Sequence, residues 1–215
     1  MGTRHVTVII KDKKVRVSQY GQWDGYYDYG GRLVLKFCRD NLICEKDPLN
    51  DYEIDKFKER VDCVTSANIS TDTPFGKYIQ EVEDKLKDFN GLSIPFNQLF
   101  PQFSRDTGVK ILDIINGLSE YDFRNKKFPL YLTFDYSWCE FIHIIDLDRQ
   151  TVYLLTNHPH KDTNPKIPAS ILNKYKGFTC FLAIKIKEIP QDMTILNKNV
   201  NDLFNVDEEE IGEVA

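Results

Sequence analysis

The stretch from Val6 to Tyr20, VTVIIKDKKVRVSQY, decides the fold of this chain. Its first five residues are mostly apolar and β-branched, as is typical of a buried strand. Residues 11–14 form a polar turn, and the residues from Val15 onward alternate between apolar and polar, which predicts a returning strand. The N-terminal segment is therefore predicted to be a β-hairpin.

The returning strand runs into an aromatic and polar turn, QYGQWDGY, at residues 19–26. A turn that only reverses the chain needs glycine and a short polar residue, not this many side chains that can stack and hydrogen-bond. We therefore consider it a binding loop, with the candidate ligand-binding residues Gln19, Tyr20, Gln22, Trp23, Asp24 and Tyr26. The alternative is structural: Trp23 and Tyr20 cover the edge of the core, and Asp24 makes an Asx turn.

Apolar periodicity predicts helices in the middle of the chain and strands toward its C-terminal part. The expected helices open at Leu33 and cover parts of 47–67, 71–86 and 107–118; the expected strands are 130–134, 139–146, 151–155 and 178–186, with loops at 91–105 and 157–168. This order predicts an α+β fold, in which an antiparallel sheet carries packed helices. We expect one globular domain over residues 1–206 and an acidic, disordered tail over 207–215.

Charge and cysteine content narrow the function classes. The net charge is -5 and the sequence shows no stripe of lysine and arginine, so we expect no binding to duplex nucleic acid. No apolar run is long enough to span a bilayer, so we expect no membrane association. The five cysteines are irregularly spaced, which favours reduced thiols in a cytoplasmic protein without a metal site or cofactor. Self-association is compatible with the sequence.

Further candidate site residues lie outside the turn. Arg105 and Asp106 precede an expected helix; Arg105 and Arg4 are candidates for binding an anionic ligand, whereas Asp106 can simply cap the helix. Glu140 and Asp146 share a face of one expected strand and could act as an acid/base pair or hold a cation, although turn chemistry also explains Asp146.

The histidines in the sequence carry a weaker signal. His158 and His160 have no third metal ligand nearby and are expected in a solvated loop. His143 is expected on a sheet face opposite to Glu140, in a structural role.

Three segments of the chain resemble a widespread family of uncharacterised proteins of bacteria, phages and fungi. They are GTRH at 2–5 with the hairpin and YGQWDGY at 20–26, SRDTGVKIL at 104–112, and CEFIHIIDLD at 139–148. The first segment is the most specific of the three. The resemblance implies no particular activity.

A weaker resemblance is to N-terminal-nucleophile hydrolases of the bile-salt-hydrolase kind. The residues that carry it are Met1-Gly2-Thr3, the hairpin and Trp23-Asp24. In that family a cysteine thiol attacks and the free α-amine acts as base. Gly2 stands here where the thiol would be, which puts that catalysis in doubt. The resemblance nevertheless implies an N-terminal-nucleophile-hydrolase-like version of the α+β fold.

The function that the sequence favours is binding, and not catalysis, of a small polar or phosphorylated ligand such as a nucleotide. The ligand would stack on Trp23 or Tyr20, and Arg4 or Arg105 would bind its charge. The occurrence of the resembled family in phages adds the hypothesis of an anti-defence protein that sequesters a signalling nucleotide. The alternatives are an N-terminal-nucleophile-like amide hydrolase and a protein-interaction module built on the aromatic turn.

Overall fold

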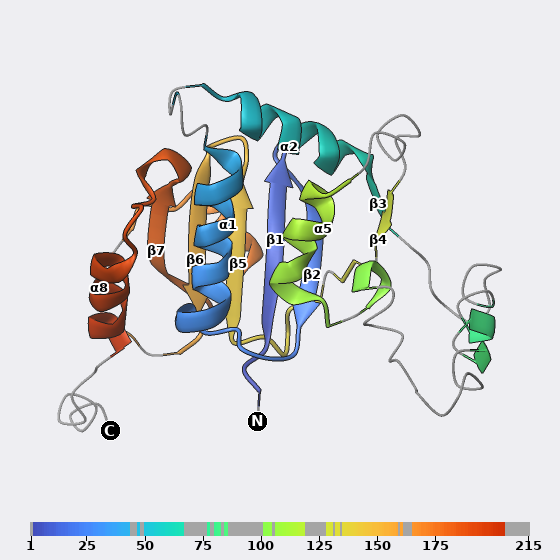
Figure 1. Ribbon diagram of the computed structural model, residues 1–215. Helices are drawn as coiled ribbons and strands as arrows, with labels where there is room; N and C mark the ends of the chain where they lie inside the picture. Colours follow the sequence, from blue (N-terminus) through green and yellow to red (C-terminus); the bar gives the residue numbers. More distant parts are fainter. Residues whose placement is uncertain are drawn as a thin grey trace, which may run out of the picture.

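The computed structural model describes residues 2–43, 47, 50–66, 77, 80–82, 84–85, 101–104, 106–118, 128–130, 132–133, 135–158, 160 and 165–204. Its centre is a mixed sheet of five strands in the order β2-β1-β5-β6-β7 (Figure 1). The strands are β1 (His5–Lys11), β2 (Lys14–Gly21), β5 (Phe141–Asp146), β6 (Thr151–Thr156) and β7 (Thr179–Lys185). No helix among the described residues has the length and apolar character needed to cross a membrane.

The pairing of the strands confirms the α+β class and the N-terminal hairpin. β1 pairs antiparallel with β2, and β5, β6 and β7 form a second antiparallel series. The two series are joined by β1 and β5, which run parallel, with His5 opposite Phe141 and Ile10 opposite Asp146. This one parallel pair departs from the purely antiparallel sheet expected from the sequence. The connection between the two strands contains helices, as a parallel crossover requires.

Both faces of the sheet are buried, because apolar residues of the central strands alternate between two hydrophobic cores. Ile9 and Ile145 belong to the first core, and Val8 and Ile144 to the second. The first core is covered by α1 (Arg32–Leu42), α2 (Tyr52–Cys63), α5 (Ile111–Asn116) and α8 (Thr194–Phe204). The second is covered by α7 (Ala169–Lys174). Figure 1 shows α1 and α5 in front of the sheet and α2 across one end of it.

The helices on the first face follow the apolar periodicity of the sequence. The stretch 47–67 contains α2, whose Ile54, Phe57 and Val61 are all buried as expected. Within 107–118, a 3-10 turn (Gly108–Lys110) leads into α5, and Val109, Leu112 and Ile115 are buried. The helix expected from Leu33 is α1, which continues directly from a π-helical turn at Tyr27–Gly31.

Other parts of the chain differ from the expectation or lie outside the described residues. β3 (Val64–Ser66) and β4 (Phe128–Leu130) form a small parallel sheet, so the strand expected at 130–134 is shorter and begins earlier. Helices α7 and α8 and the 3-10 turn at Ile186–Glu188 were not expected. The described residues at 77, 80–82 and 84–85 are helical, whereas the rest of 71–86, the loop at 91–100 and the tail at 207–215 lie outside the described residues.

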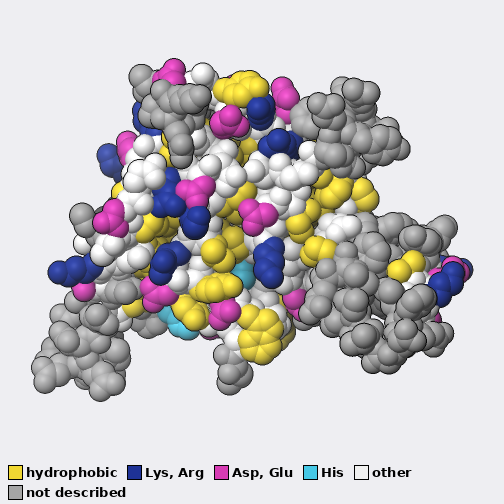
Figure 2. All heavy atoms as spheres, viewed as in Figure 1, with side chains coloured by type: hydrophobic (Ala, Val, Ile, Leu, Met, Phe, Trp, Pro, Cys, Tyr) yellow, Lys and Arg dark blue, Asp and Glu magenta, His cyan; other side chains and the backbone are white. Residues whose placement is uncertain are grey.

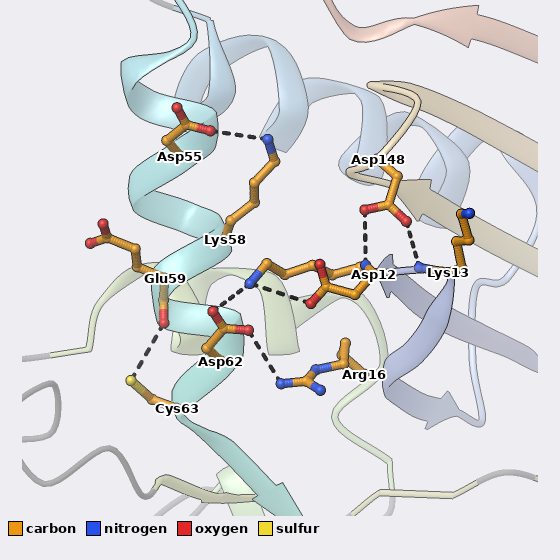
Figure 3. A network of polar contacts seen from close by, with 10 residues as sticks. Asp12, Lys13, Arg16, Asp55, Lys58, Glu59, Asp62, Cys63 and Asp148 are labelled. Carbon is orange, nitrogen blue, oxygen red and sulfur yellow. Dashed lines mark hydrogen bonds and ion pairs between the residues drawn. The ribbon is translucent and has the colours of Figure 1, made fainter.

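The tip of the N-terminal hairpin is tied to two other elements (Figure 3). Asp12 and Lys13 have φ of 54° and 59°, as in the type I′ turns that match the twist of paired strands. The carboxylate of Asp148, from the turn between β5 and β6, accepts their backbone N–H groups at 2.9 and 2.7 Å. Asp62 of α2 binds the ammonium of Lys11 and, at 3.2 Å, the guanidinium of Arg16. These contacts fix the tip against both α2 and the sheet.

We predict that Phe57→Ala lowers the free energy of unfolding by about 3–5 kcal/mol. Phe57 is fully buried, and its ring centroid lies 5.3 Å from that of Phe37 in α1, so truncation leaves a cavity between the two helices. Urea unfolding followed by circular dichroism measures the change. Tyr52→Ala, an exposed position on the same helix, is the control and is expected to cost far less; equal losses would contradict this packing.

Candidate functional site

A cavity of about 370 Å³ opens where β1 begins and β2 ends. It is lined by residues from three separate segments: Arg4, Tyr20, Gln22, Thr133, Asp135, Trp138 and Cys139. Three of these, Arg4, Tyr20 and Gln22, are residues that the sequence indicates as ligand-binding. We call this space the ligand cavity.

Arg4 is fixed by the strand that lies parallel to its own. Its carbonyl accepts the backbone N–H groups of Glu140 and Phe141 at 2.9 and 3.2 Å, and its own N–H donates to Oε1 of Glu140 at 3.3 Å. The guanidinium of Arg4 differs from its backbone in hydrogen bonding. Its Nε is buried and has no hydrogen-bond partner among the described residues. A buried donor without an acceptor costs about 1–3 kcal/mol, so a ligand acceptor at this place would be stabilising.

Tyr20 and Gln22 contribute an aromatic ring and an amide to the ligand cavity. The Tyr20 hydroxyl donates to Oε1 of Gln22 at 2.6 Å, which orients both side chains. Because the amide oxygen of Gln22 already accepts a hydrogen bond, its NH₂ group is the part that can donate to a ligand. This wall therefore offers a stacking surface and a donor.

The opposite wall comes from the segment before β5. Trp138 lines the ligand cavity and is 72% exposed, so its ring is accessible to a ligand. Asp135 accepts the backbone N–H of Ser137 at 2.9 Å, and hydrogen bonds from Ser137 lower the pKa of its carboxyl. Burial raises the pKa of the Cys139 thiol to about 12, so this sulfur stays protonated and is a poor nucleophile.

The remaining residues of the aromatic turn do not line the ligand cavity. Trp23 is 63% exposed and lies over Gly2, where an added Cβ would come within 2.0 Å of its ring. Asp24 has φ of 55°, and its carbonyl accepts the N–H of Gly30 at 3.0 Å. The Tyr26 carbonyl accepts two N–H groups of the π-helical turn, while its ring is exposed. These residues shape the loop instead.

Gln19 and Asp106 also lie outside the ligand cavity. Gln19 is fully buried, and its amide donates to the carbonyls of Tyr20 and Ser104 at 3.2 and 3.1 Å. Asp106 is exposed, and its backbone N–H donates to the Ser104 hydroxyl. Arg105, the expected second anion-binding residue, lies outside the described residues.

The two carboxylates of β5 are not brought together. Glu140 contacts His158 at 3.1 Å, at one end of the strand. Asp146, at the other end, is fully buried and binds the guanidinium of Arg149 at 2.9 Å, while its Oδ1 accepts two backbone N–H groups of the turn. Turn chemistry thus accounts for Asp146, and the acid/base pair suggested by the sequence does not form. His158 is exposed, as expected for a solvated loop, and its Nε2 lies 3.1 Å from Oε2 of Glu140.

A pair of buried histidines was missed by the sequence reasoning. His5 and His143 lie on neighbouring parallel strands with ring centroids 5.2 Å apart, so His143 does have a partner. Neither ring nitrogen of His5 has a hydrogen-bond partner among the described residues. Burial lowers the pKa of His5 to about 4. The pKa of His143 is lowered well below its ordinary value by burial and then by His5, which the Gly25 backbone opposes only weakly.

Glycines from two distant segments pack directly on this histidine pair. A Cβ at Gly21 would lie 2.3 Å from Cε1 of His5, and one at Gly30 would lie 2.8 Å from Cε1 of His143. Gly25 and Gly108 approach His5 almost as closely. Their recurrence around the aromatic turn was the signal that could have revealed the pair. The rings are enclosed, so we assign them a structural role.

Metal and thiol chemistry receive little support from the described part of the chain. It contains no group of three or more His, Cys, Asp or Glu side chains that could hold a metal ion. Cys38, Cys63, Cys139 and Cys180 are buried free thiols. Comparisons of the chain with protein-family models, with curated proteins and with solved structures found no match. The two family resemblances therefore stay predictions.

Because burial lowers the pKa of both histidines, we predict that the protein loses stability in mild acid. The folded state keeps His5 neutral down to a pH of about 4, whereas the unfolded chain binds a proton below its ordinary value of 6.5. The free energy of unfolding is therefore unaffected by His5 above pH 6.5, and it decreases as the pH falls from 6.5 toward 4. The loss amounts to about 3 kcal/mol for His5, and His143 adds to it in the same direction.

Urea unfolding at a series of pH values between about 7.5 and 5 measures the greater part of this loss. The variant His158→Gln, which removes an exposed imidazole, should retain the same pH dependence. A free energy of unfolding that stays constant over this range would show that the buried pair is not kept neutral.

Substitution of Gly21 by alanine should destabilise the protein by about 1–3 kcal/mol, because the added methyl group overlaps the His5 ring. A double-mutant cycle with His5→Ala tests the cause. Since His5→Ala removes the overlapping ring, the alanine at position 21 should cost much less in that background. Additive losses would mean that the glycine is required for another reason.

Proposed function

We propose that this protein binds a small, planar, phosphorylated compound of the nucleotide class in the ligand cavity. The observation that carries the proposal is Arg4, which lines the cavity and whose buried Nε has no partner among the described residues. An arginine pairs with phosphate through several donors at once, which makes phosphate a suitable ligand group for it.

The other lining residues support a planar ring with a hydrogen-bonding edge. Trp138 and Tyr20 offer aromatic faces on which a nucleobase could stack. The Asp135 carboxylate can accept from an amino or imino group of the base, and the Gln22 NH₂ can donate to a ring acceptor. A volume of about 370 Å³ falls within the roughly 300–1,000 Å³ of typical ligand sites.

Binding without turnover fits the chemistry of these side chains better than catalysis. The thiol in the cavity has a raised pKa of about 12, and no histidine is among the described residues that line it. The resembled hydrolases carry their nucleophilic side chain where this chain has Gly2. The Trp23 ring occupies the space that such a side chain would need.

A pocket that binds a nucleotide without turnover suits a protein that sequesters the nucleotide in the cytoplasm. This is the anti-defence role expected from the resemblance to a family with phage members.

A protein-interaction module is the second candidate, and one observation favours it. Trp23, Tyr26 and Tyr29 are exposed on the loop between β2 and α1. Figure 2 shows hydrophobic side chains at the surface on this side of the molecule. Exposed aromatic rings of this kind are frequent at the centre of protein interfaces. Size-exclusion chromatography with light scattering, compared with Trp23→Ala, tests this alternative.

We predict that nucleotides quench the fluorescence of Trp138 and raise the melting temperature. A thermal-shift screen of nucleoside mono-, di- and triphosphates, including cyclic forms, identifies the ligand, and fluorescence titration gives its Kd. Trp138→Ala should weaken binding by about tenfold or more, since stacking of one base contributes about 1–3 kcal/mol. Arg4→Gln should weaken it to a similar extent through the lost charge-assisted hydrogen bonds.

The chain offers matched controls for both substitutions. Trp23→Phe removes the other tryptophan and should leave the ligand-dependent quenching intact, whereas Trp138→Phe should abolish it. Arg32→Gln removes an exposed arginine outside the ligand cavity and should leave Kd unchanged. Absence of any nucleotide-induced shift at millimolar concentration, or quenching that survives Trp138→Phe, would overturn the proposal.

A further inference from the structure

A second cavity, of about 630 Å³, lies at the opposite end of β1 and β2 from the ligand cavity. Four cationic side chains line it: Lys13, Lys14, Arg149 and Lys174. Buried apolar residues of the second core, including Ile10 and Ile171, form part of its wall. No carboxylate is among the described residues that line it, although the chain has a net charge of -5. We call this space the basic cavity.

The two lysines of the hairpin tip are placed by a fixed backbone. The φ of Lys13 is 59°, and the Asp148 carboxylate accepts the N–H groups of both turn residues. Both oxygen atoms of the Asp148 carboxylate thus accept backbone N–H groups. Figure 3 shows the Lys13 side chain apart from Asp62 and Arg16. The turn therefore directs Lys13 away from the carboxylate that neutralises its neighbours.

Arg149 is oriented by a buried carboxylate. Nη1 of Arg149 lies 2.9 Å from Oδ2 of Asp146, which is fully buried. This hydrogen bond and the charge of Asp146 raise the pKa of the guanidinium. One edge of the guanidinium is held by Asp146, and 42% of the side-chain surface remains exposed. An arginine anchored in this way presents its other donors with little loss of conformational freedom.

The three lysines of the basic cavity differ from three other lysines of the described part of the chain in having no carboxylate beside them. Lys11, Lys36 and Lys58 each form an ion pair with an aspartate. In contrast, the ammonium groups of Lys13, Lys14 and Lys174 have no carboxylate within ion-pair distance among the described residues; Lys174 has only the face of Tyr175, at 5.9 Å. Three uncompensated cations and an anchored guanidinium around one cavity repel each other unless an anion lies between them.

We propose that the basic cavity binds a small compound that carries several clustered phosphate groups, such as a polyphosphate or an inositol phosphate. Lysine ammonium groups from the hairpin tip and α7 would surround the phosphates, while Arg149 would bind one of them through two donors. A polyphosphate and an inositol phosphate share a dense negative charge, which a single phosphate does not supply. The proposal is independent of the nucleotide proposed for the ligand cavity.

Calorimetric titration with sodium tripolyphosphate tests the proposal, at low and at near-physiological salt. The double variant Lys14→Gln/Lys174→Gln removes two cations from the basic cavity. The control, Lys187→Gln/Lys198→Gln, changes the net charge by the same amount at exposed positions that do not line it. Thermal unfolding without ligand establishes that both variants are folded, as expected because all four side chains are exposed.

We expect tripolyphosphate to bind the unmodified protein with one site, more weakly as salt rises. Lys14→Gln/Lys174→Gln should weaken binding at least about tenfold and the control less than about twofold. Trp138→Ala should leave the affinity for tripolyphosphate unchanged, because Trp138 lines the ligand cavity and not the basic cavity. Titration with inositol hexakisphosphate and with a nucleoside triphosphate distinguishes the sources of the phosphates. Equal weakening in both lysine variants, or no binding at millimolar tripolyphosphate and low salt, would overturn the proposal.

Discussion

The contact between the buried histidine pair and the glycines around it is the constraint on which the rest of this structure depends. His5 and His143 lie side by side beneath the loop that follows β2, and the loop can reach them only because Gly21 and Gly30 have no side chain. Glycine in a strand often marks such a close approach of another group. The rings thereby fix the N-terminal segment, the aromatic turn and the start of α1 relative to one another. Arg4, the neighbour of His5, is positioned by its hydrogen bonds with Glu140 and Phe141.

The two proposed sites follow from the ends of the same pair of strands. The ligand cavity lies where β1 begins, and the basic cavity where β1 ends. Both lie on the face that is covered by α7, and aromatic packing of Tyr136 on Tyr175 connects the segments that line them. At each end a carboxylate of the β5 region organises the backbone: Glu140 binds the N–H of Arg4, and Asp146 and Asp148 organise the two turns. These carboxylates build the cavities without lining them.

Local patterns in the sequence were sufficient for the five strands of the central sheet and for α1, α2 and α5 on the first face. The alternation after Val15 predicts a returning strand, and the spacing of Ile54, Phe57 and Val61 predicts a buried helix face; both interpretations are confirmed. The parallel pairing of β1 with β5 could not be predicted in this way, because it joins segments more than a hundred residues apart.

The same limit applies to the candidate sites. Arg4, Tyr20 and Gln22 were indicated by their residue types, but Trp138 comes from a remote segment. The cations of the basic cavity come from the hairpin tip, the turn after β5 and one short helix, so no sequence window contains them together.

The parallel pairing of β1 with β5 also has a consequence for biosynthesis. The N-terminal hairpin leaves the ribosome early, yet the second edge of β1 has no partner until residues 141–146 have been made. At about 5–20 residues per second this interval lasts roughly 7–27 seconds. During that time an apolar, β-branched edge, VTVII, is open to pairing with other chains. The nascent chain therefore depends on the speed of translation, or on a chaperone that covers this edge, until the sheet is complete.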